Sequence, residues 1–155
     1  MNKKYPGKLL FLILLLIVNS LILILVFSDR ENNNIPRKEV CFSNNCFNAE
    51  TAETYEEQEK GLMYRTRMKD NEGMLFIFKE PDSYGFWMKN TLIPLDIIWM
   101  DEDKKIVTIK EASPCKTGPC EIYYPSKNAS YVLEIKGGLT KKNNIGAGDF
   151  ASFSE

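Results

Sequence analysis

An uncharged apolar run at residues 9–27 constrains this 155-residue chain more than any other feature. At about 1.5 Å per residue, a helix of that length reaches across the roughly 30 Å hydrocarbon core of a bilayer. Three lysines precede the run, whereas Asp29 and Glu31 follow it. By the positive-inside rule, this asymmetry predicts a single-pass signal-anchor at residues 1–28, located in the cell membrane with the C-terminal part outside the cytoplasm.

A cleaved signal peptide is the alternative, because Val26 and Ser28 are small enough for cleavage after Ser28. The run exceeds the usual h-region of about 7–15 residues, which favours the uncleaved anchor. A polar linker at residues 29–36 would then lead to one extracytoplasmic domain at residues 37–155. That length is sufficient for a single hydrophobic core.

The four cysteines form two pairs, Cys41 with Cys46 and Cys115 with Cys120, and the chain has no histidine. Four thiolates could hold a zinc ion, but structural zinc sites usually have tighter spacing, and an exported domain lies where thiols oxidise. Two disulfides are therefore favoured, although four cysteines allow three pairings. Turn-forming residues between the members of each pair favour nearest partners.

Short apolar or alternating runs separated by turn residues predict a mainly β domain of sandwich or jelly-roll type. One helix is expected at residues 54–62, where Thr54 and Glu57 form a capping box and Gly61 can end the helix. A second short helix is expected at residues 139–144. The expected strands are residues 38–42, 46–52, 73–78, 84–91, 96–100, 105–112, 130–136 and 149–153.

Five sequence blocks carry a family resemblance: "EKGLMYRTRM", "GMLFIF", "FWMKNTLIPLDIIWMD", "YVLEIKGG" and "IGAGD". Their order and spacing resemble the domain-of-unknown-function family 192, also called uncharacterised protein family 0127, over residues 38–153. The resemblance implies a mainly β fold of sandwich or jelly-roll kind, often exported or membrane-anchored. It implies no activity, and the first cysteine pair looks like an addition to the family pattern.

The block "FWMKNTLIPLD" gathers polar side chains where an apolar strand ends. Strand alternation places Asn90 and Trp87 on opposite faces, and both faces become polar toward Thr91. Pro94 then turns the chain, so Asp96 is expected beside the same rim. Lys89, Asn90, Thr91 and Asp96 either form and cap a turn or, with aromatic rings such as Trp87 and Tyr124, bind a small polar ligand.

Three further residues are candidates for ligand binding or modification. Arg65 could form an ion pair with Asp96 or Asp149, or bind a carboxylate or phosphate group. Asp149 follows a glycine-rich turn that is too short for a phosphate loop. Asn128 opens an "NAS" triplet, which matches the N-glycosylation acceptor pattern.

Several function classes are disfavoured by composition. The absence of histidine excludes Ser-His-Asp and Cys-His catalysis, so an enzyme is only the third hypothesis. A net charge of −1 without a strongly basic stretch argues against nucleic acid as a partner. No metal site or cofactor is expected. The first hypothesis is a binding module for a small polar or carbohydrate-like ligand at the cell envelope, and the second is a structural or protein-interaction domain there.

Overall fold

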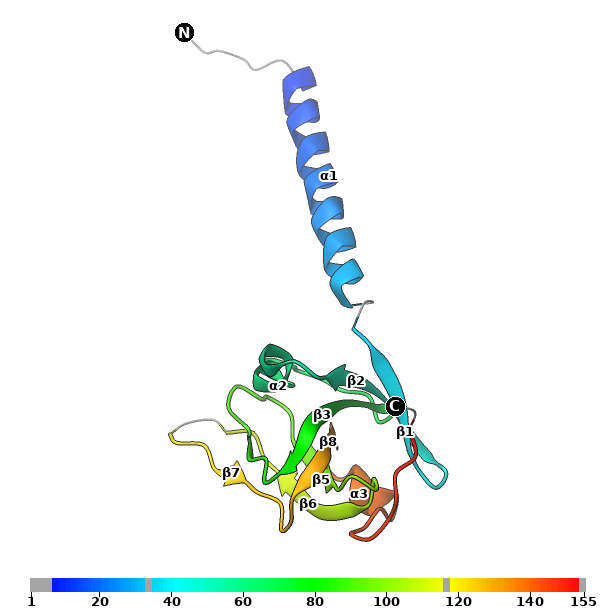
Figure 1. Cartoon of the computed structure of the whole chain (residues 1–155). Coiled ribbons are helices and arrows are strands. Elements are labelled where there is room, and N and C mark those ends of the chain that lie inside the picture. Colours follow the sequence, from blue (N-terminus) through cyan, green and yellow to red (C-terminus); the bar gives the residue numbers. More distant parts are fainter. Residues whose placement is uncertain (1–6, 33–34, 116–117, 154–155) are drawn as a thin grey trace. The chain divides into compact units, whose positions relative to one another are not determined.

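The computed structural model describes residues 7–32, 35–115 and 118–153. The chain divides into two compact units, Met1–Ile35 and Pro36–Glu155 (Figure 1). The first unit contains α1 (Gly7–Asn32), and the second contains all the strands and two short helices, α2 (Tyr55–Lys60) and α3 (Leu139–Lys142).

The expected membrane-spanning anchor is wrong. Within the residues that the structure describes, no helix is both long and apolar enough to cross a membrane. The described side chains of α1 are exposed and occupy residues 10–23. The prediction that the chain lies in the cell membrane depended on this anchor and is therefore wrong as well.

One mixed six-stranded sheet and one two-stranded sheet make up the second unit (Figure 1). The larger sheet has the order β1-β2-β3-β8-β5-β6, and β4 pairs with β7 in the smaller one. Among the strand pairings of the described residues, β2–β3 alone is parallel, and α2 lies in the connection between these two strands. The bounds are Arg37–Phe42 (β1), Asn45–Ala52 (β2), Glu72–Asp82 (β3), Phe86–Trp87 (β4), Leu95–Met100 (β5), Ile106–Ala112 (β6), Ile122–Tyr123 (β7) and Ala129–Lys136 (β8).

The expected mainly β fold with few short helices is confirmed, whereas a sandwich or jelly roll stays a prediction. The expected strand at residues 84–91 is reduced to β4, because the chain turns at Asn90, whose φ is +57°. The last expected strand makes only isolated bridges, Lys105 with Phe150 and Cys41 with Ser152.

Alternating side chains place a hydrophobic cluster on each face of the large sheet. The cluster that matters for the candidate site includes Leu62, Met74, Phe76, Ile97 and Trp99, all buried. We call the sheet face that carries these residues of β3 and β5 the α2 face, because α2 and the segment after it cover it. The opposite cluster includes Val40, Leu75, Ile98, Leu133 and Ile135.

The predicted capping box fixes the start of α2. The Glu57 amide donates to the Thr54 hydroxyl at 3.3 Å, and the Glu57 carboxylate accepts from the Thr54 amide at 2.9 Å. Donation from the Thr54 and Glu53 backbone N–H groups to the Glu57 carboxylate lowers the pKa of Glu57. Gly61 ends the helix with a φ of +46°, and a Cβ there would lie 3.3 Å from the Phe76 ring. The helix therefore sits directly over the α2 face.

Candidate functional site

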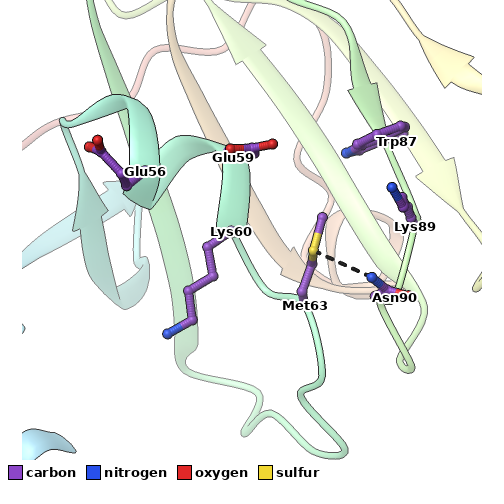
Figure 2. Close-up of a pocket in the computed structure, with 7 residues that line it drawn as sticks. All are labelled: Glu56, Glu59, Lys60, Met63, Trp87, Lys89 and Asn90. Atoms are coloured by element: carbon purple, nitrogen blue, oxygen red, sulfur yellow. Dashed lines mark hydrogen bonds between the residues drawn. The ribbon is translucent and has the colours of Figure 1, made fainter.

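A cleft of about 310 Å³ lies between α2 and the segment that follows β4 (Figure 2). We call it the α2 cleft. Its polar and aromatic lining combines both charges with an amide and an indole. The lining residues are Glu56, Glu59, Lys60, Met63, Trp87, Lys89 and Asn90. Three candidates from the sequence, Trp87, Lys89 and Asn90, are therefore brought together here.

Trp87 provides an aromatic surface in the α2 cleft. Pairing with Ile122 in the small sheet holds its backbone, yet 41% of the residue is exposed. The Lys89 ammonium lies 4.8 Å from the centre of the indole ring, which is a cation–π distance. Glu59 lies on the side of α2 that faces Trp87 (Figure 2). The cleft thus offers one flat apolar surface with charged groups around it.

Asn90 connects the two walls of the α2 cleft. Its side-chain amide donates to the Tyr64 hydroxyl at 2.9 Å and lies 3.9 Å from the Met63 sulfur. The main-chain carbonyl of Asn90 accepts a hydrogen bond from the main-chain amide of Tyr64 at 2.8 Å. Asn90 and Tyr64 both adopt positive φ, a conformation that Asn tolerates better than most residues. Asn90 therefore shapes the turn and also presents a polar group to the cleft.

A smaller cavity of about 30 Å³ adjoins the α2 cleft and shares Glu59, Lys60, Met63, Trp87 and Lys89 with it. We call it the floor cavity. Its remaining lining residues are Gln58, Gly61, Leu62, Phe76, Phe86, Thr91 and Glu134. Predicted candidate Thr91 is buried here, and its hydroxyl donates weakly to the Lys89 carbonyl at 3.5 Å.

Glu134 is the unexpected member of the floor cavity. It is only 4% exposed, and burial raises its pKa to about 8. In β8 it shares a strand face with Ser130, Val132 and Lys136. In the sequence these residues look like one half-polar face. The position is buried because α2 and the segment after it cover that face, and the sequence pattern does not reveal this covering.

Asp96 does not line the α2 cleft. It is fully buried and accepts hydrogen bonds from the Gly138 amide at 2.9 Å and from the Thr140 amide and hydroxyl at 2.8 and 2.7 Å. Its register partner on β8 is Ile135, a member of the opposite cluster. Its contacts therefore connect β5 to the start of α3.

Arg65 forms an ion pair, but its partner is neither Asp96 nor Asp149. The guanidinium contacts one carboxylate oxygen of Glu50, and Arg37 contacts the other oxygen at 2.8 Å. Glu50 is 3% exposed on β2, so two guanidinium groups compensate one buried charge. Arg65 thereby holds the segment after α2 against the α2 face.

The remaining candidates lie outside the α2 cleft. Tyr124 is 53% exposed, two residues beyond Ile122 in the chain. Asp149 is exposed and accepts from the Gly146 amide at 2.8 Å, which closes a turn. Asn128 is exposed, as a glycosylation acceptor must be, and its amide donates to the Pro81 carbonyl at 3.4 Å.

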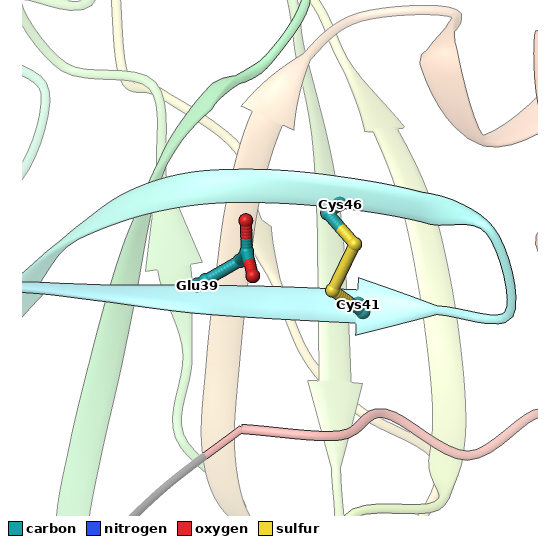
Figure 3. Close-up of side chains that lie close together, drawn as sticks. All are labelled: Glu39, Cys41 and Cys46. Carbon is teal, nitrogen blue, oxygen red and sulfur yellow. A yellow bond between two sulfur atoms is a disulfide. The ribbon is translucent and has the colours of Figure 1, made fainter.

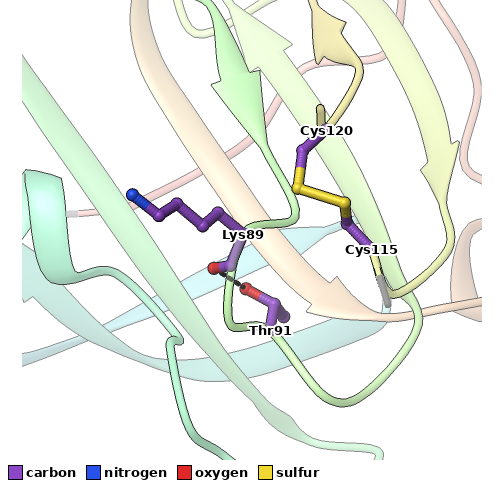
Figure 4. The surroundings of a disulfide bond; sticks show 4 residues. All are labelled: Lys89, Thr91, Cys115 and Cys120. Atoms are coloured by element: carbon purple, nitrogen blue, oxygen red, sulfur yellow. Dashed lines mark hydrogen bonds between the residues drawn. A yellow bond between two sulfur atoms is a disulfide. The ribbon is translucent and has the colours of Figure 1, made fainter. Parts of the chain in front are cut away.

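Both cysteine pairs are disulfides between the nearest partners. Cys41 and Cys46 are register partners in the β1–β2 hairpin, with Glu39 beside them (Figure 3). Glu39 and the two sulfurs lie within 4.8 Å of one another, but sulfurs bonded to each other are not thiolate ligands. Cys115 and Cys120 close the loop before β7, and Lys89 and Thr91 lie around them (Figure 4). The second disulfide therefore supports the strand that pairs with Trp87.

Comparison with known proteins places this geometry in a family. The model of domain of unknown function 192, described as "Uncharacterized ACR", matches residues 39–153. UPF0127 proteins of Thermococcus gammatolerans and Thermococcus kodakarensis are 27% and 26% identical over 106 and 105 residues, or 67% and 66% of this chain. The matched region spans 65% and 62% of the length of these two curated relatives.

Two solved structures are similar in sequence and in fold. A protein of unknown function from Novosphingobium aromaticivorans is 38% identical, with a TM-score of 0.69 over 76% of this chain and 84% of its own. A protein from Sinorhizobium meliloti, named provisionally as a transcription regulator, is 32% identical, with a TM-score of 0.68 over 76% and 92%.

Proposed function

The chain belongs to the domain-of-unknown-function family 192, as its sequence blocks indicated, and we propose that it binds a small polar, carbohydrate-like ligand in the α2 cleft. The observation that carries this proposal is the exposed Trp87 ring beside the polar groups of Glu59, Lys89 and Asn90. An accessible aromatic ring with a few convergent polar groups around it is the usual lining of a small-molecule site.

The chemistry of the α2 cleft suits a sugar ring. The apolar C–H face of a pyranose can pack on the indole, as amphipathic ligands do on aromatic side chains. Its hydroxyl groups can donate to the Glu59 carboxylate and accept from the Lys89 ammonium and the Asn90 amide. The cleft volume of about 310 Å³ is at the small end of the range for ligand pockets, so one or two rings are the appropriate size.

A protein-interaction domain is the second candidate. It is favoured by exposed large side chains on the segments that follow α2 and β4, namely Tyr64 at 68% and Leu92 at 55% exposure. Exposed aromatic and aliphatic groups of this kind are common at the centres of protein interfaces. On that hypothesis the α2 cleft would receive a partner's side chain rather than a free small molecule.

A thermal-shift screen of the full-length chain against sugars, nucleotides and organic acids tests the proposal. We expect sugars to raise the melting temperature through mass action. The rise should disappear in Trp87→Ala and persist in Phe150→Ala, a matched control because Lys105 lies over an exposed Phe150 ring outside the cleft. Stabilisation that survives Trp87→Ala, or no stabilising sugar, would contradict the proposal.

A further inference from the structure

Glu134 is a buried carboxyl group without a partner. Among the residues described, no backbone or side-chain group hydrogen-bonds it or forms an ion pair with it. Its neighbours in register are Met74 on β3 and Ile97 on β5, both apolar. The contrast is with Glu50 on the same sheet face, two strands away, whose two oxygens are paired with Arg37 and Arg65.

This arrangement is unfavourable for the folded state alone. Most buried polar groups in native proteins are hydrogen-bonded, and burying a carboxyl group without a protein partner costs free energy. An aliphatic side chain at position 134 would continue the apolar row of Met74 and Ile97. Among the described residues, no fully enclosed side-chain nitrogen or oxygen lacks a hydrogen-bond partner, so the unpaired Glu134 oxygens are not sealed off but reach the floor cavity. An unpaired carboxyl group with access to a cavity indicates a role outside folding.

The floor cavity gives Glu134 access to a ligand. Its volume of about 30 Å³ is enough for one or two water-sized groups. Aromatic rings of Phe76, Phe86 and Trp87 line it, and it shares lining residues with the larger α2 cleft. A ligand bound in the cleft can therefore extend one small group toward the Glu134 carboxyl.

We propose that Glu134 binds the protonated primary amine of a ligand whose body occupies the α2 cleft. This inference rests on the proposed function and names the ligand class, an amine-bearing, amino-sugar-like molecule. A carboxylate surrounded by aromatic rings suits an ammonium group, because charge-assisted hydrogen bonds and cation–π attraction act together. The Lys89 ammonium over Trp87 shows that this wall already accommodates a cation.

The charged groups around the floor cavity also favour a cation. Glu59 from α2 adds a second carboxylate, while Lys60 from α2 and Lys89 from the segment after β4 are the cations in the lining. Lys89 lies on the Trp87 ring and forms no ion pair with Glu134 among the described residues. Since burial raises the pKa of Glu134 to about 8, an incoming ammonium releases the Glu134 proton to the buffer at pH 7.

The test compares glucosamine, N-acetylglucosamine and glucose, which differ at one position as ammonium, neutral amide and hydroxyl. Calorimetry on the full-length chain at pH 7 should show glucosamine binding about tenfold more tightly than the other two. The preference should vanish in Glu134→Gln, which keeps size and removes charge. Titrations in two buffers of different ionisation enthalpy should show the release of close to one proton for glucosamine only.

A second measurement separates failure of this inference from failure of the proposed function. Methylammonium chloride should shift the Glu134 side-chain carboxyl ¹³C resonance, assigned by its absence in Glu134→Gln. Equal binding of all three sugars without a methylammonium shift overturns the amine site and leaves the sugar cleft standing. A methylammonium shift without sugar binding overturns the sugar cleft and supports the amine site. If the sugars do not bind and methylammonium causes no shift, both the sugar cleft and the amine site are overturned.

Discussion

Asp96 and Thr140 are joined by two hydrogen bonds, although 44 residues separate them: the carboxylate accepts from the Thr140 amide at 2.8 Å and from its hydroxyl at 2.7 Å. A third bond comes from the Gly138 amide at 2.9 Å. The buried carboxylate thus replaces the missing hydrogen-bond acceptors at the start of α3, as a side chain does at a helix N-terminus. This fold-determining role explains why Asp96 is placed away from the α2 cleft.

Asp96→Ala should destabilise the domain by about 3 kcal/mol, because it leaves buried N–H donors without an acceptor. Thr140→Val removes only the hydroxyl bond and should cost about 1.5 kcal/mol. Urea unfolding followed by far-UV circular dichroism measures both. Asp96→Ala with native stability would show that water replaces the carboxylate and that the contacts are dispensable.

The ion pairs of Glu50 give the second prediction. Arg65→Ala and Arg37→Ala should each destabilise the domain by about 1–2 kcal/mol, because the other guanidinium still compensates Glu50. The double variant leaves a buried charge unpaired and should lose more than the sum of the two single losses, about 5 kcal/mol. A double-mutant cycle on unfolding free energies measures this coupling. Strict additivity would contradict the shared role of the two arginines.

Glu134 predicts an unusual pH dependence of stability. Its pKa rises from 4.5, the ordinary value that also applies when unfolded, to about 8 in the folded chain. Between these values the folded state holds the proton more tightly, so stability falls as pH rises, by up to about 1.4 kcal/mol per pH unit. Below pH 4.5 this contribution is fully present, and above about pH 8 it is lost.

Glu134→Met should therefore stabilise the domain at pH 7 and remove this contribution to the slope. Glu134→Gln should remove the slope but keep a polar group without a protein partner, and so stabilise less. Denaturant unfolding at several pH values between 5 and 8 provides the measurement. A slope that persists in both variants would assign it to other groups, and a destabilised Glu134→Met would show that the carboxyl serves the fold.

The two disulfides should differ in their effect on the α2 cleft. On the chain-entropy model each short loop contributes about 2 kcal/mol, so Cys41→Ser/Cys46→Ser and Cys115→Ser/Cys120→Ser should lose similar stability. Only the second pair lies next to β7, whose Ile122 pairs with Trp87. Its removal should therefore weaken sugar binding severalfold, whereas removal of the first pair leaves affinity unchanged. Equal affinities would show that β4 does not need the loop.

Periodicity located most strands and the capping box located α2, because both depend on local spacing. Local spacing could not predict that the strand expected at residues 84–91 ends early. The left-handed turn at Asn90 depends on contacts with Tyr64 from a distant segment. The Arg65 ion pair was anticipated, but its partner Glu50 becomes visible only when β2 and β3 pair in parallel.

In the candidate site, too, residues close in sequence could be predicted, whereas a residue from a distant strand could not. Trp87, Lys89 and Asn90 are close in sequence, so their gathering followed from one strand and one turn. Glu134 was missed because an alternating strand does not reveal which of its faces another segment will cover. The apolar run at residues 9–27 shows the opposite error, in which composition was converted directly into a membrane span.

The fluorescence of Trp87 tests the central claim most directly. The chain has two tryptophans, and Trp99 is fully buried, with its indole N–H donating to the Tyr84 carbonyl at 2.9 Å. Titration of the full-length chain with glucosamine should therefore change the emission of exposed Trp87, saturably, with no change in Trp87→Phe. An unchanged spectrum at saturating sugar, or an equal change in Trp87→Phe, would contradict ligand binding in the α2 cleft.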